Sequence, residues 1–305
     1  MSESPPTAPV CYRHPGRETY VRCTRCDRPI CPDCMREASV GHQCPECVDE
    51  GRRSVRPART AFGGGIAGRH GYVTKALIAL NVLFMVLSIA SDRGGDAAAG
   101  GSGFGGLLGG DTPLTLWGGV LGYASYVPLG PVHGVAAGEW YRLISAMFLH
   151  YGLLHLLLNS WALWVIGREL EAALGRWRFL ALYLIAGFGG NVAVYLFSAP
   201  NQPPTVGAST AIFGLFAAMF VIMRRLGLDT SSIVPVLVVN LVFTFAVPRI
   251  SIAGHLGGLV IGALTAVVLA YAPRGRRTLV QVVGCAVIVL LLLGVAVFRT
   301  VYLLG

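Results

Sequence analysis

The sequence predicts an all-α polytopic membrane protein that carries a small cysteine-rich domain at its N-terminus. Of its 305 residues, 54% are hydrophobic and 13% are charged, whereas soluble domains usually carry about 25% charged residues. Seven apolar segments are interpreted as membrane spans. Seven of the eight cysteines fall within residues 11–47, ahead of the first apolar segment.

A formal net charge of +9 would suit a nucleic-acid-binding protein, but the positions of the positive residues favour another explanation. Twelve of the 24 lysines and arginines lie in residues 1–75, among the cysteines and before the spans. Positive charge on one side of the spans holds that side in the cytoplasm. We therefore expect no nucleic-acid partner.

The N-terminal domain is predicted to bind zinc. Residues 1–10 are predicted to be disordered, and residues 11–47 hold four pairs of ligand-type residues: Cys11 with His14, Cys23 with Cys26, Cys31 with Cys34, and Cys44 with Cys47. Eight ligands fill two tetrahedral structural Zn²⁺ sites. Disulfides would need an oxidising compartment, which a cytoplasmic N-terminus does not offer. His42 is interpreted as a surface histidine because eight ligands are already present.

This pattern resembles a B-box-type zinc finger. The resemblance implies a cross-brace, in which Cys11, His14, Cys31 and Cys34 hold one ion and Cys23, Cys26, Cys44 and Cys47 hold the other. Pairing of neighbours along the chain is the alternative that the sequence leaves open. The resemblance also implies a cytoplasmic protein partner. Residues 48–71 are rich in Arg, Gly and Ala without an apolar period, so we expect a flexible linker there.

The predicted spans follow one another at short intervals, apart from one long loop. They are Val73–Ala90, Leu143–Ile166, Phe179–Phe197, Ser209–Met223, Ile233–Val247, Ile252–Tyr271 and Leu279–Phe298. The long loop, residues 91–138, is Gly- and Ala-rich from Gly94 to Gly110. Its later part carries Leu, Trp and Tyr, which favours a position in the membrane interface.

The charge distribution predicts the orientation of the spans. With the N-terminus inside, 20 of the 24 lysines and arginines fall on the inner side. The outer side holds Arg93, Arg142, Arg249 and Arg299. This bias predicts a multi-pass cell-membrane protein with a cytoplasmic N-terminus and a C-terminus outside.

Ser209 lies near the start of the fourth span, among small residues and directly after a polar loop. A lone serine in an apolar helix usually bonds to its own helix or marks a helix contact. His255 in the sixth span changes this interpretation, because ionisable residues inside a membrane are expensive and are candidates for function. Glycines at 254, 258 and 262 give that span a small face, which would let the His255 ring reach Ser209.

A second polar group lies on the predicted second span. His155 and Asn159 are four residues apart and therefore share one helical face. His150 lies near the outer end of the same span. These side chains could join helices by hydrogen bonds. The alternative is an oxyanion site, with donors aimed at an attacked carbonyl.

Together, these motifs resemble the rhomboid intramembrane serine proteases over residues 72–272. They are Gly-x-Ser at Ser209, a glycine-flanked His255 two spans later, and His150, His155 and Asn159 on the second span. Arg142, Glu171 and Gly175 match further family positions. Residues 273–305 would form an additional seventh span after the six-helix bundle. Three positions depart from the family: Thr210 stands where glycine is common, Phe213 where tyrosine is frequent, and Tyr141 where tryptophan is usual.

The resemblance implies an intramembrane serine endopeptidase that cleaves transmembrane segments of other proteins. Ser209 and His255 would form a catalytic dyad, since the fourth to sixth spans contain no Asp or Glu, and Asn159, His155 and His150 would support the oxyanion. No cofactor is expected for catalysis. One alternative is an inactive relative that binds or traffics membrane clients. A proton-relay transporter would need paired carboxylates within the spans and an internal repeat, and the sequence has neither.

Overall fold

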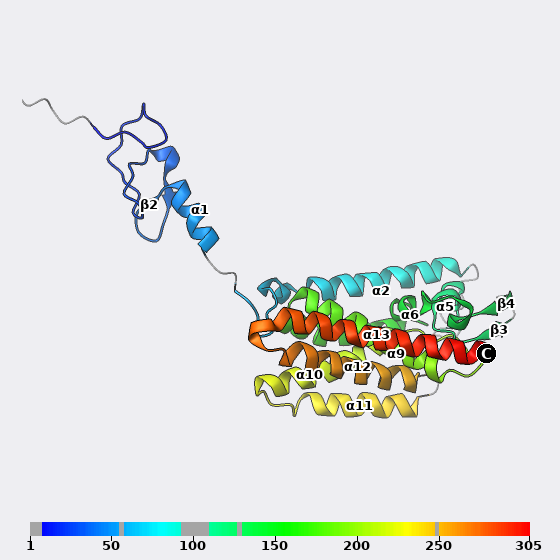
Figure 1. The fold of residues 1–305 in the computed structure, drawn as a ribbon. Helices are drawn as coiled ribbons and strands as arrows, with labels where there is room; N and C mark the ends of the chain where they lie inside the picture. The colour runs from blue at the N-terminus through cyan, green and yellow to red at the C-terminus, as the bar shows by residue number, and fades with distance from the viewer. Residues whose placement is uncertain (1–7, 55–57, 93–109, 127–129, 248–249) are drawn as a thin grey trace, which may run out of the picture. The chain divides into compact units, whose positions relative to one another are not determined.

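The computed structural model describes residues 8–54, 58–92, 110–126, 130–247 and 250–305. The chain forms two compact units that part between Ala58 and Arg59 (Figure 1). Most of the N-terminal stretch predicted to be disordered, and the Gly- and Ala-rich stretch from Gly94, lie outside the described residues.

The first unit has little regular structure. It contains a short 3-10 helix, η1 (Pro32–Cys34), an antiparallel pair of two-residue strands, β1 (Arg36–Glu37) and β2 (His42–Gln43), and the helix α1 (Pro45–Ser54). Its buried apolar residues are Ile30 and the cysteines 11, 23, 31, 34, 44 and 47. A unit with so small an apolar core needs its cysteine clusters to hold it together.

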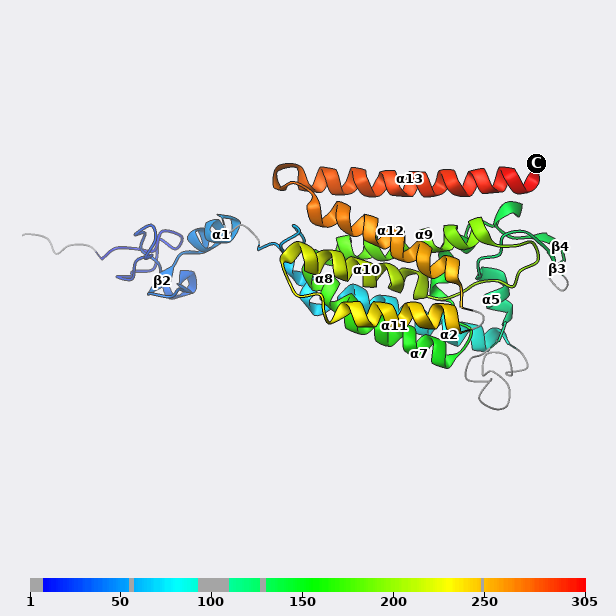
Figure 2. The ribbon, with the colours of Figure 1, turned by 90° about the horizontal axis from the view of Figure 1, so that it is seen from below.

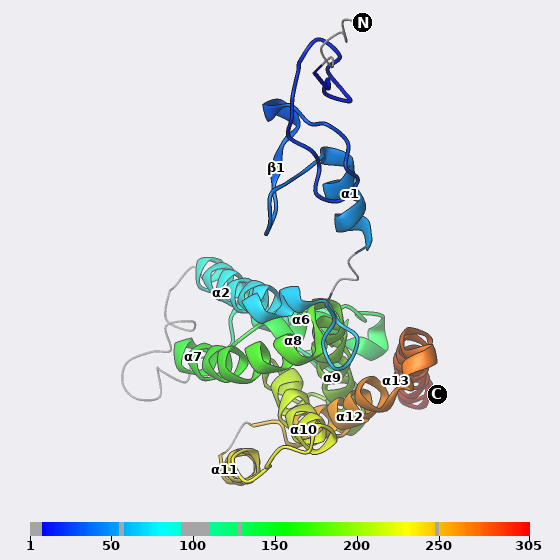
Figure 3. The same ribbon diagram turned by 90° about the vertical axis from the view of Figure 1, so that its left-hand side faces the viewer.

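The second unit is a bundle of helices (Figures 2 and 3). Its first half contains η2 (Ile66–His70), α2 (Tyr72–Ser91), α5 (Pro113–Gly118), the antiparallel strands β3 (Ala124–Tyr126) and β4 (Gly130–His133), η3 (Val135–Ala137), α6 (Arg142–Ser145) and η4 (Ala146–Phe148). Its second half contains α7 (Leu153–Ala162), a π-helical turn η5 (Leu163–Gly167), α8 (Arg168–Leu174), α9 (Arg176–Phe197), α10 (Ser209–Leu226), α11 (Ile233–Ala246), α12 (Ile252–Tyr271), η6 (Arg274–Arg276) and α13 (Arg277–Leu304).

The prediction of a helical, multi-pass membrane protein is confirmed. Among the described residues, five helices are long and apolar enough to cross a membrane: α2, α9, α10, α12 and the helix through Arg274–Leu304. A sixth span is possible if the bent pair Arg142–Phe148 and Leu153–Leu174 is counted as one. The predicted fifth span is the shorter apolar helix α11. Its 14 residues extend about 21 Å, less than the roughly 30 Å of a hydrocarbon core.

The predicted second span, Leu143–Ile166, is wrong at its N-terminal side. The chain bends by 90° between Phe148 and Leu153, so His150 lies in the bend rather than on a helix. The segment before the bend is apolar because it is packed inside the protein. Leu143 is 1% exposed and its carbonyl accepts a hydrogen bond of 2.9 Å from the Asn191 side chain of α9.

Helices α9, α10 and α12 pack closely at the centre of the bundle (Figure 3). A Cβ atom on Gly262 of α12 would lie 2.2 Å from the Cα of Gly214 on α10. Helix α13 packs on the side of α12 and α9 away from α11 (Figure 2). Its Thr300 hydroxyl is 2.8 Å from the Tyr195 hydroxyl of α9.

The segment that begins at Arg59 packs onto α8 and so differs from the flexible linker expected for residues 48–71. Phe62 is buried, and a Cβ atom on Gly64 would lie 2.0 Å from the carbonyl oxygen of Leu174. A Cβ atom on Gly68 would lie 2.2 Å from the carbonyl oxygen of Glu171. The glycines that remove any apolar period from this stretch are the residues that let its backbone approach another backbone.

Candidate active site

Ser209 is the first residue of α10, and a glycine two residues earlier shapes the approach to it. Gly207 has a φ of +141°, a conformation that favours glycine, and its N–H donates to the Ala146 carbonyl at 2.9 Å. The preceding loop is held by the pairing of Thr205 with Val120. Ser209 is partly exposed, and its N–H belongs to the first helical turn, whose N–H groups have no partner within the helix.

The His255 side chain of α12 reaches Ser209. Its Nε2 lies 2.9 Å from the Ser209 Oγ, although the two residues are 46 positions apart in the chain. The approach depends on glycine, because a Cβ atom on Gly258 would lie 1.9 Å from the carbonyl oxygen of Thr210. The small face predicted on this helix is therefore where α12 meets α10.

Two further side chains hold the His255 ring. Phe213, one turn after Ser209, stacks on the ring with centroids 3.9 Å apart and planes 18° apart. On the ring's other nitrogen, the Nδ1 of His255 lies 2.7 Å from the Thr244 Oγ1 of α11. The Thr244 contact was missed at the sequence level. The only signal was a hydroxyl residue among the apolar residues of a helix, which usually has a local meaning.

The residues predicted to support an oxyanion lie in three different environments. The His155 ring and the Ser209 Oγ border the same small space, since a Cβ atom on Gly207 would meet them at 3.0 and 3.2 Å. The His150 ring is 5.1 Å from that of His155. Its buried nitrogens lack a well-aligned hydrogen bond with a described residue. The Asn159 amide nitrogen donates 3.0 Å to the His155 carbonyl of its own helix.

A charged network holds the loop that precedes α6. Arg142 is 1% exposed and donates to the carbonyls of Leu116 at 2.7 Å and Gly119 at 2.9 Å, and to the Glu139 carboxylate at 2.6 Å. Burial acts to raise the pKa of Glu139, but hydrogen bonds from His133, Arg142 and the Gly134 N–H lower it overall. Glu139 is therefore ionised at neutral pH, and its negative charge balances the positive charge of Arg142.

The carboxylate of Glu171 joins α8 to the start of α2. It accepts from the N–H groups of Val73 at 3.1 Å and Thr74 at 2.9 Å, and from the Thr74 hydroxyl at 2.9 Å. The two N–H groups belong to the first turn of α2 and have no partner within that helix, and negative charge is favourable at such an N-terminus. Glu171 thus has a structural role that does not involve Ser209.

In the first unit, the predicted metal ligands gather into two groups. Cys11, His14, Cys31 and Cys34 form one, and Cys23, Cys26, Cys44 and Cys47 form the other, with the donor atoms of each group within 4.8 Å of one another. The sulfurs of a tetrahedral zinc site lie about 3.8 Å apart when each Zn–S bond is about 2.3 Å. The Sγ atoms of Cys11 and Cys34 are 3.8 Å apart, as are those of Cys26 and Cys44. The donor sets therefore fit zinc, with the ligands grouped as in a cross-brace.

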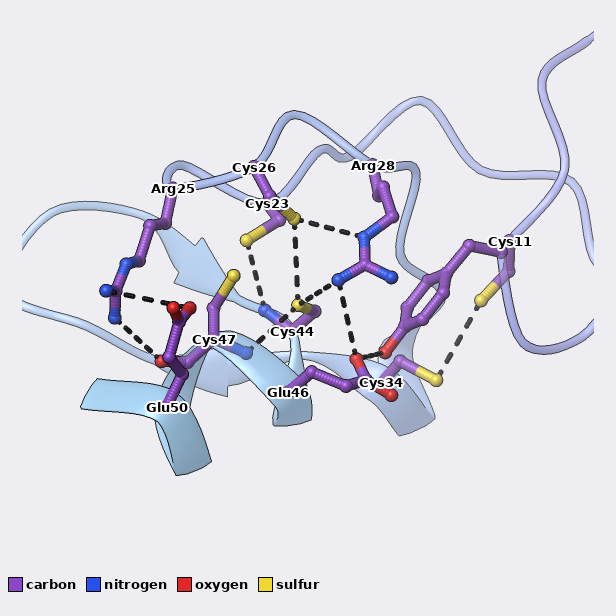
Figure 4. A network of polar contacts seen from close by, with 11 residues as sticks. Cys11, Cys23, Arg25, Cys26, Arg28, Cys34, Cys44, Glu46, Cys47 and Glu50 are labelled. Carbon is purple, nitrogen blue, oxygen red and sulfur yellow. Dashed lines mark hydrogen bonds and ion pairs between the residues drawn. The ribbon is translucent and has the colours of Figure 1, made fainter. Parts of the chain in front are cut away.

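Arg28 lies beside the four-cysteine group (Figure 4). Its Nε donates to the Cys26 Sγ at 3.2 Å, and its Nη2 lies 3.7 Å from the Cys44 Sγ. The hydrogen bond from Arg28 lowers the pKa of Cys26. Four thiolates around one divalent ion would carry a net negative charge, and this arginine would offset part of it.

The chain is similar to known proteins in the region of the helical bundle. Residues 137–272 match the rhomboid domain. The "Rhomboid protease GluP" of Bacillus subtilis (strain 168) is 40% identical over 146 residues, which cover 46% of this chain and 28% of that protein. The "Putative rhomboid protease YdcA" of the same organism is 40% identical over 136 residues, covering 43% of this chain and 68% of YdcA.

A plant protein is also similar. The "RHOMBOID-like protein 5" of Arabidopsis thaliana is 36% identical over 147 residues, covering 46% of this chain and 47% of that protein. The chain thus spans less than half of GluP and of RHOMBOID-like protein 5, and about two thirds of YdcA. The matched region contains both Ser209 and His255, and by these similarities the chain belongs to the rhomboid family.

Proposed function

We propose that this chain is an intramembrane serine endopeptidase in which Ser209 is the nucleophile and His255 the general base. The observation that carries the proposal is the 2.9 Å contact between the Ser209 Oγ and the His255 Nε2. Two side chains from widely separated spans meet here in the geometry that proton transfer requires. Family membership supports the same reaction class.

The reaction would proceed by acyl transfer. The Ser209 Oγ bonds to the scissile carbonyl carbon while its proton passes to the His255 Nε2. The resulting imidazolium protonates the leaving amine, and a water molecule activated by the same nitrogen then hydrolyses the acyl-enzyme. No metal or cofactor is required for these steps.

The oxyanion would be stabilised at the N-terminus of α10. The Ser209 N–H lies in the first helical turn, where the helix dipole favours negative charge. The His155 ring borders the same space as the Ser209 Oγ and would supply a second donor. Asn159 would join them if its amide turned from the His155 carbonyl, and His150 would support His155.

The substrate would be a transmembrane helix of another protein in the same lipid bilayer. The positive-inside bias supports an orientation with the N-terminus in the cytoplasm and Ser209 near the outer face. Helix-weakening residues in the substrate would favour cleavage, because an intact helix keeps its carbonyls hydrogen-bonded. The N-terminal unit would bind two structural zinc ions and recruit a cytoplasmic protein partner.

A catalytically inactive rhomboid-like protein that binds or traffics clients is the alternative function. Labelling with a fluorophosphonate in detergent separates the two, because the reagent modifies only an activated serine. We expect covalent labelling of the wild type and none of the Ser209→Ala variant. Equal labelling of both, or of neither, would rule out the serine mechanism.

A further inference from the structure

The Thr244 hydroxyl occupies the position that a third catalytic group usually takes. It lies 2.7 Å from the His255 Nδ1, on the side of the ring opposite to Ser209. Thr244 is 2% exposed and is, with Ile233, one of two buried residues of α11. The Thr244 hydroxyl is thus held at this nitrogen in a buried position.

The direction of this hydrogen bond follows from the single proton of the Thr244 hydroxyl. Thr244 Oγ1 also lies 2.8 Å from the Asn240 carbonyl, one turn earlier in α11. A carbonyl can only accept, and the geometry of this contact fits a hydrogen bond from the Thr244 hydroxyl to the Asn240 carbonyl. With that proton on the Asn240 carbonyl, the bond between Thr244 and His255 runs from the Nδ1–H to the Thr244 oxygen.

We propose that Thr244 is a positioning residue that holds His255 in the Nδ1–H tautomer. This inference rests on the proposed function. In that tautomer Nε2 carries the lone pair, and it faces the Ser209 hydroxyl, whose proton it must accept. The opposite tautomer would present an N–H to Ser209 and could not act as a base.

The Thr244 oxygen has a second consequence during turnover. When His255 becomes an imidazolium, its Nδ1–H bonds to a neutral acceptor rather than to a carboxylate. Hydrogen bonds to charged groups are stronger than neutral ones. Thr244 therefore supports the charged ring without adding a buried negative charge to the membrane interior.

The first test compares three variants in cleavage of a model transmembrane substrate. Thr244→Val keeps the shape but removes the acceptor, and we expect kcat to fall by about 10- to 100-fold with KM within about twofold. Thr244→Ser restores the oxygen and should return kcat to within about threefold of wild type. Thr265→Val is the matched control. Thr265 is buried in α12 and bonds to the Ile261 carbonyl at 2.8 Å, as Thr244 bonds to Asn240.

The second test reads the tautomer directly and does not depend on cleavage. The ¹⁵N chemical shifts of a neutral histidine distinguish the two tautomers. We expect a single Nδ1–H form in the wild type and in Thr244→Ser, and a mixture in Thr244→Val. If the Val variant does not fold, Thr244→Ala is measured in its place.

The outcomes separate the inference from the proposed function. A Thr244→Val variant that keeps the wild-type tautomer and kcat overturns the role of Thr244, while loss of cleavage in Ser209→Ala still supports the dyad. A wild type that neither cleaves nor reacts with fluorophosphonate overturns the function. In that case the tautomer shifts still decide whether Thr244 sets the ring. Equal losses in Thr244→Val and Thr265→Val would assign Thr244 a role in stability alone.

Discussion

At the scale of single residues, the site depends on how a few buried polar atoms are satisfied. The Ser209 and His255 side chains are joined to each other, and the ring is enclosed by Phe213 and Thr244. The Thr210 hydroxyl, by contrast, is buried and has no hydrogen-bond partner among the described residues. Of these two adjacent hydroxyl residues of α10, Ser209 hydrogen-bonds to His255, whereas Thr210 makes no hydrogen bond with a described residue.

Replacing either member of the dyad should abolish cleavage without unfolding the protein. We expect Ser209→Ala and His255→Ala each to lower kcat/KM of a model transmembrane substrate by more than about 10⁴-fold. The bundle should stay folded at the assay temperature, although His255→Ala loses the buried contacts of the ring with Phe213 and Thr244 and should lower the thermal unfolding midpoint more than Ser209→Ala does. Cleavage by Ser209→Ala above a mock preparation would contradict the mechanism.

Thr210 should contribute by its shape and not by its hydroxyl. It is 3% exposed, and its Cβ lies where a side chain on Gly190 would meet it at 2.7 Å. Thr210→Val removes an unsatisfied hydroxyl, so stability should stay equal or rise by about 1 kcal/mol. Thr210→Gly should retain activity but lower stability by about 1–2 kcal/mol through a cavity and a more flexible helix. Chemical unfolding and the cleavage assay check both; a large loss of activity in the Val variant would mean that the hydroxyl is needed.

At the scale of elements, the separation between α10 and α12 decides whether the dyad forms. The two helices meet at the backbone, through Gly214, Gly258 and Gly262. Because no side chains separate the two helices at these points, the His255 ring lies close enough to contact Ser209. Under the proposed mechanism, the distance between the two helices would therefore affect catalysis as well as packing.

Adding one methyl group at this contact should lower the activity of the site. A Cβ atom on Gly258 would lie 1.9 Å from the Thr210 carbonyl oxygen, so Gly258→Ala must push α12 away from α10. We expect at least a tenfold loss of kcat, since a misplacement of about 1 Å costs on the order of 10²-fold. Gly294→Ala in α13 is the control, because nothing lies within 4 Å of that added atom. Equal activity of the two variants would show that the contact is not critical.

At the scale of the whole molecule, two units with different sources of stability share one chain. The first has few buried apolar residues apart from its cysteines, and the second buries an extensive apolar core. The segment after Arg59 belongs to the second unit by its packing on α8. The stability of one unit should therefore respond to metal and that of the other should not.

The first unit should contain two zinc ions and should unfold when they are removed. Metal analysis of the purified chain is expected to give two zinc ions per molecule. A strong chelator should abolish the fold of residues 11–47, because metal binding supplies most of the folding free energy of such a unit. Cleavage in detergent should be unaffected. One ion per chain, or none, would refute the two-site assignment.

The boundary of the catalytic unit should lie at Arg59. A chain that starts there keeps Phe62, Gly64 and Gly68 against α8, and we expect wild-type cleavage in detergent. A chain that starts at Gly71 loses the buried Phe62 side chain, which contributes about 1.5–3 kcal/mol. Its unfolding midpoint should fall, and its activity with it. Full activity and stability of the shorter chain would show that this segment does not support the bundle.

The sequence by itself determined the membrane class, the positions of most spans, the family and the eight candidate zinc ligands. These features depend on composition and on the spacing of nearby residues, which can be counted in the sequence. The pairing of Ser209 with His255 was also within reach, since an ionisable residue in an apolar helix and a row of glycines are both local signals.

Only the tertiary structure decided the features that depend on contacts between distant residues. The bend before Leu153 could not be predicted, because an apolar segment buried in protein and one buried in lipid look alike in sequence. The packing of Arg59–His70 follows from the backbone of residues 171–175, 103 or more positions away from Gly68. The grouping of the zinc ligands needed coordinates because two pairings satisfy the same spacing. The Thr244 contact could not be predicted from the sequence, because the role of a threonine in an apolar helix depends on the ring that another helix places beside it.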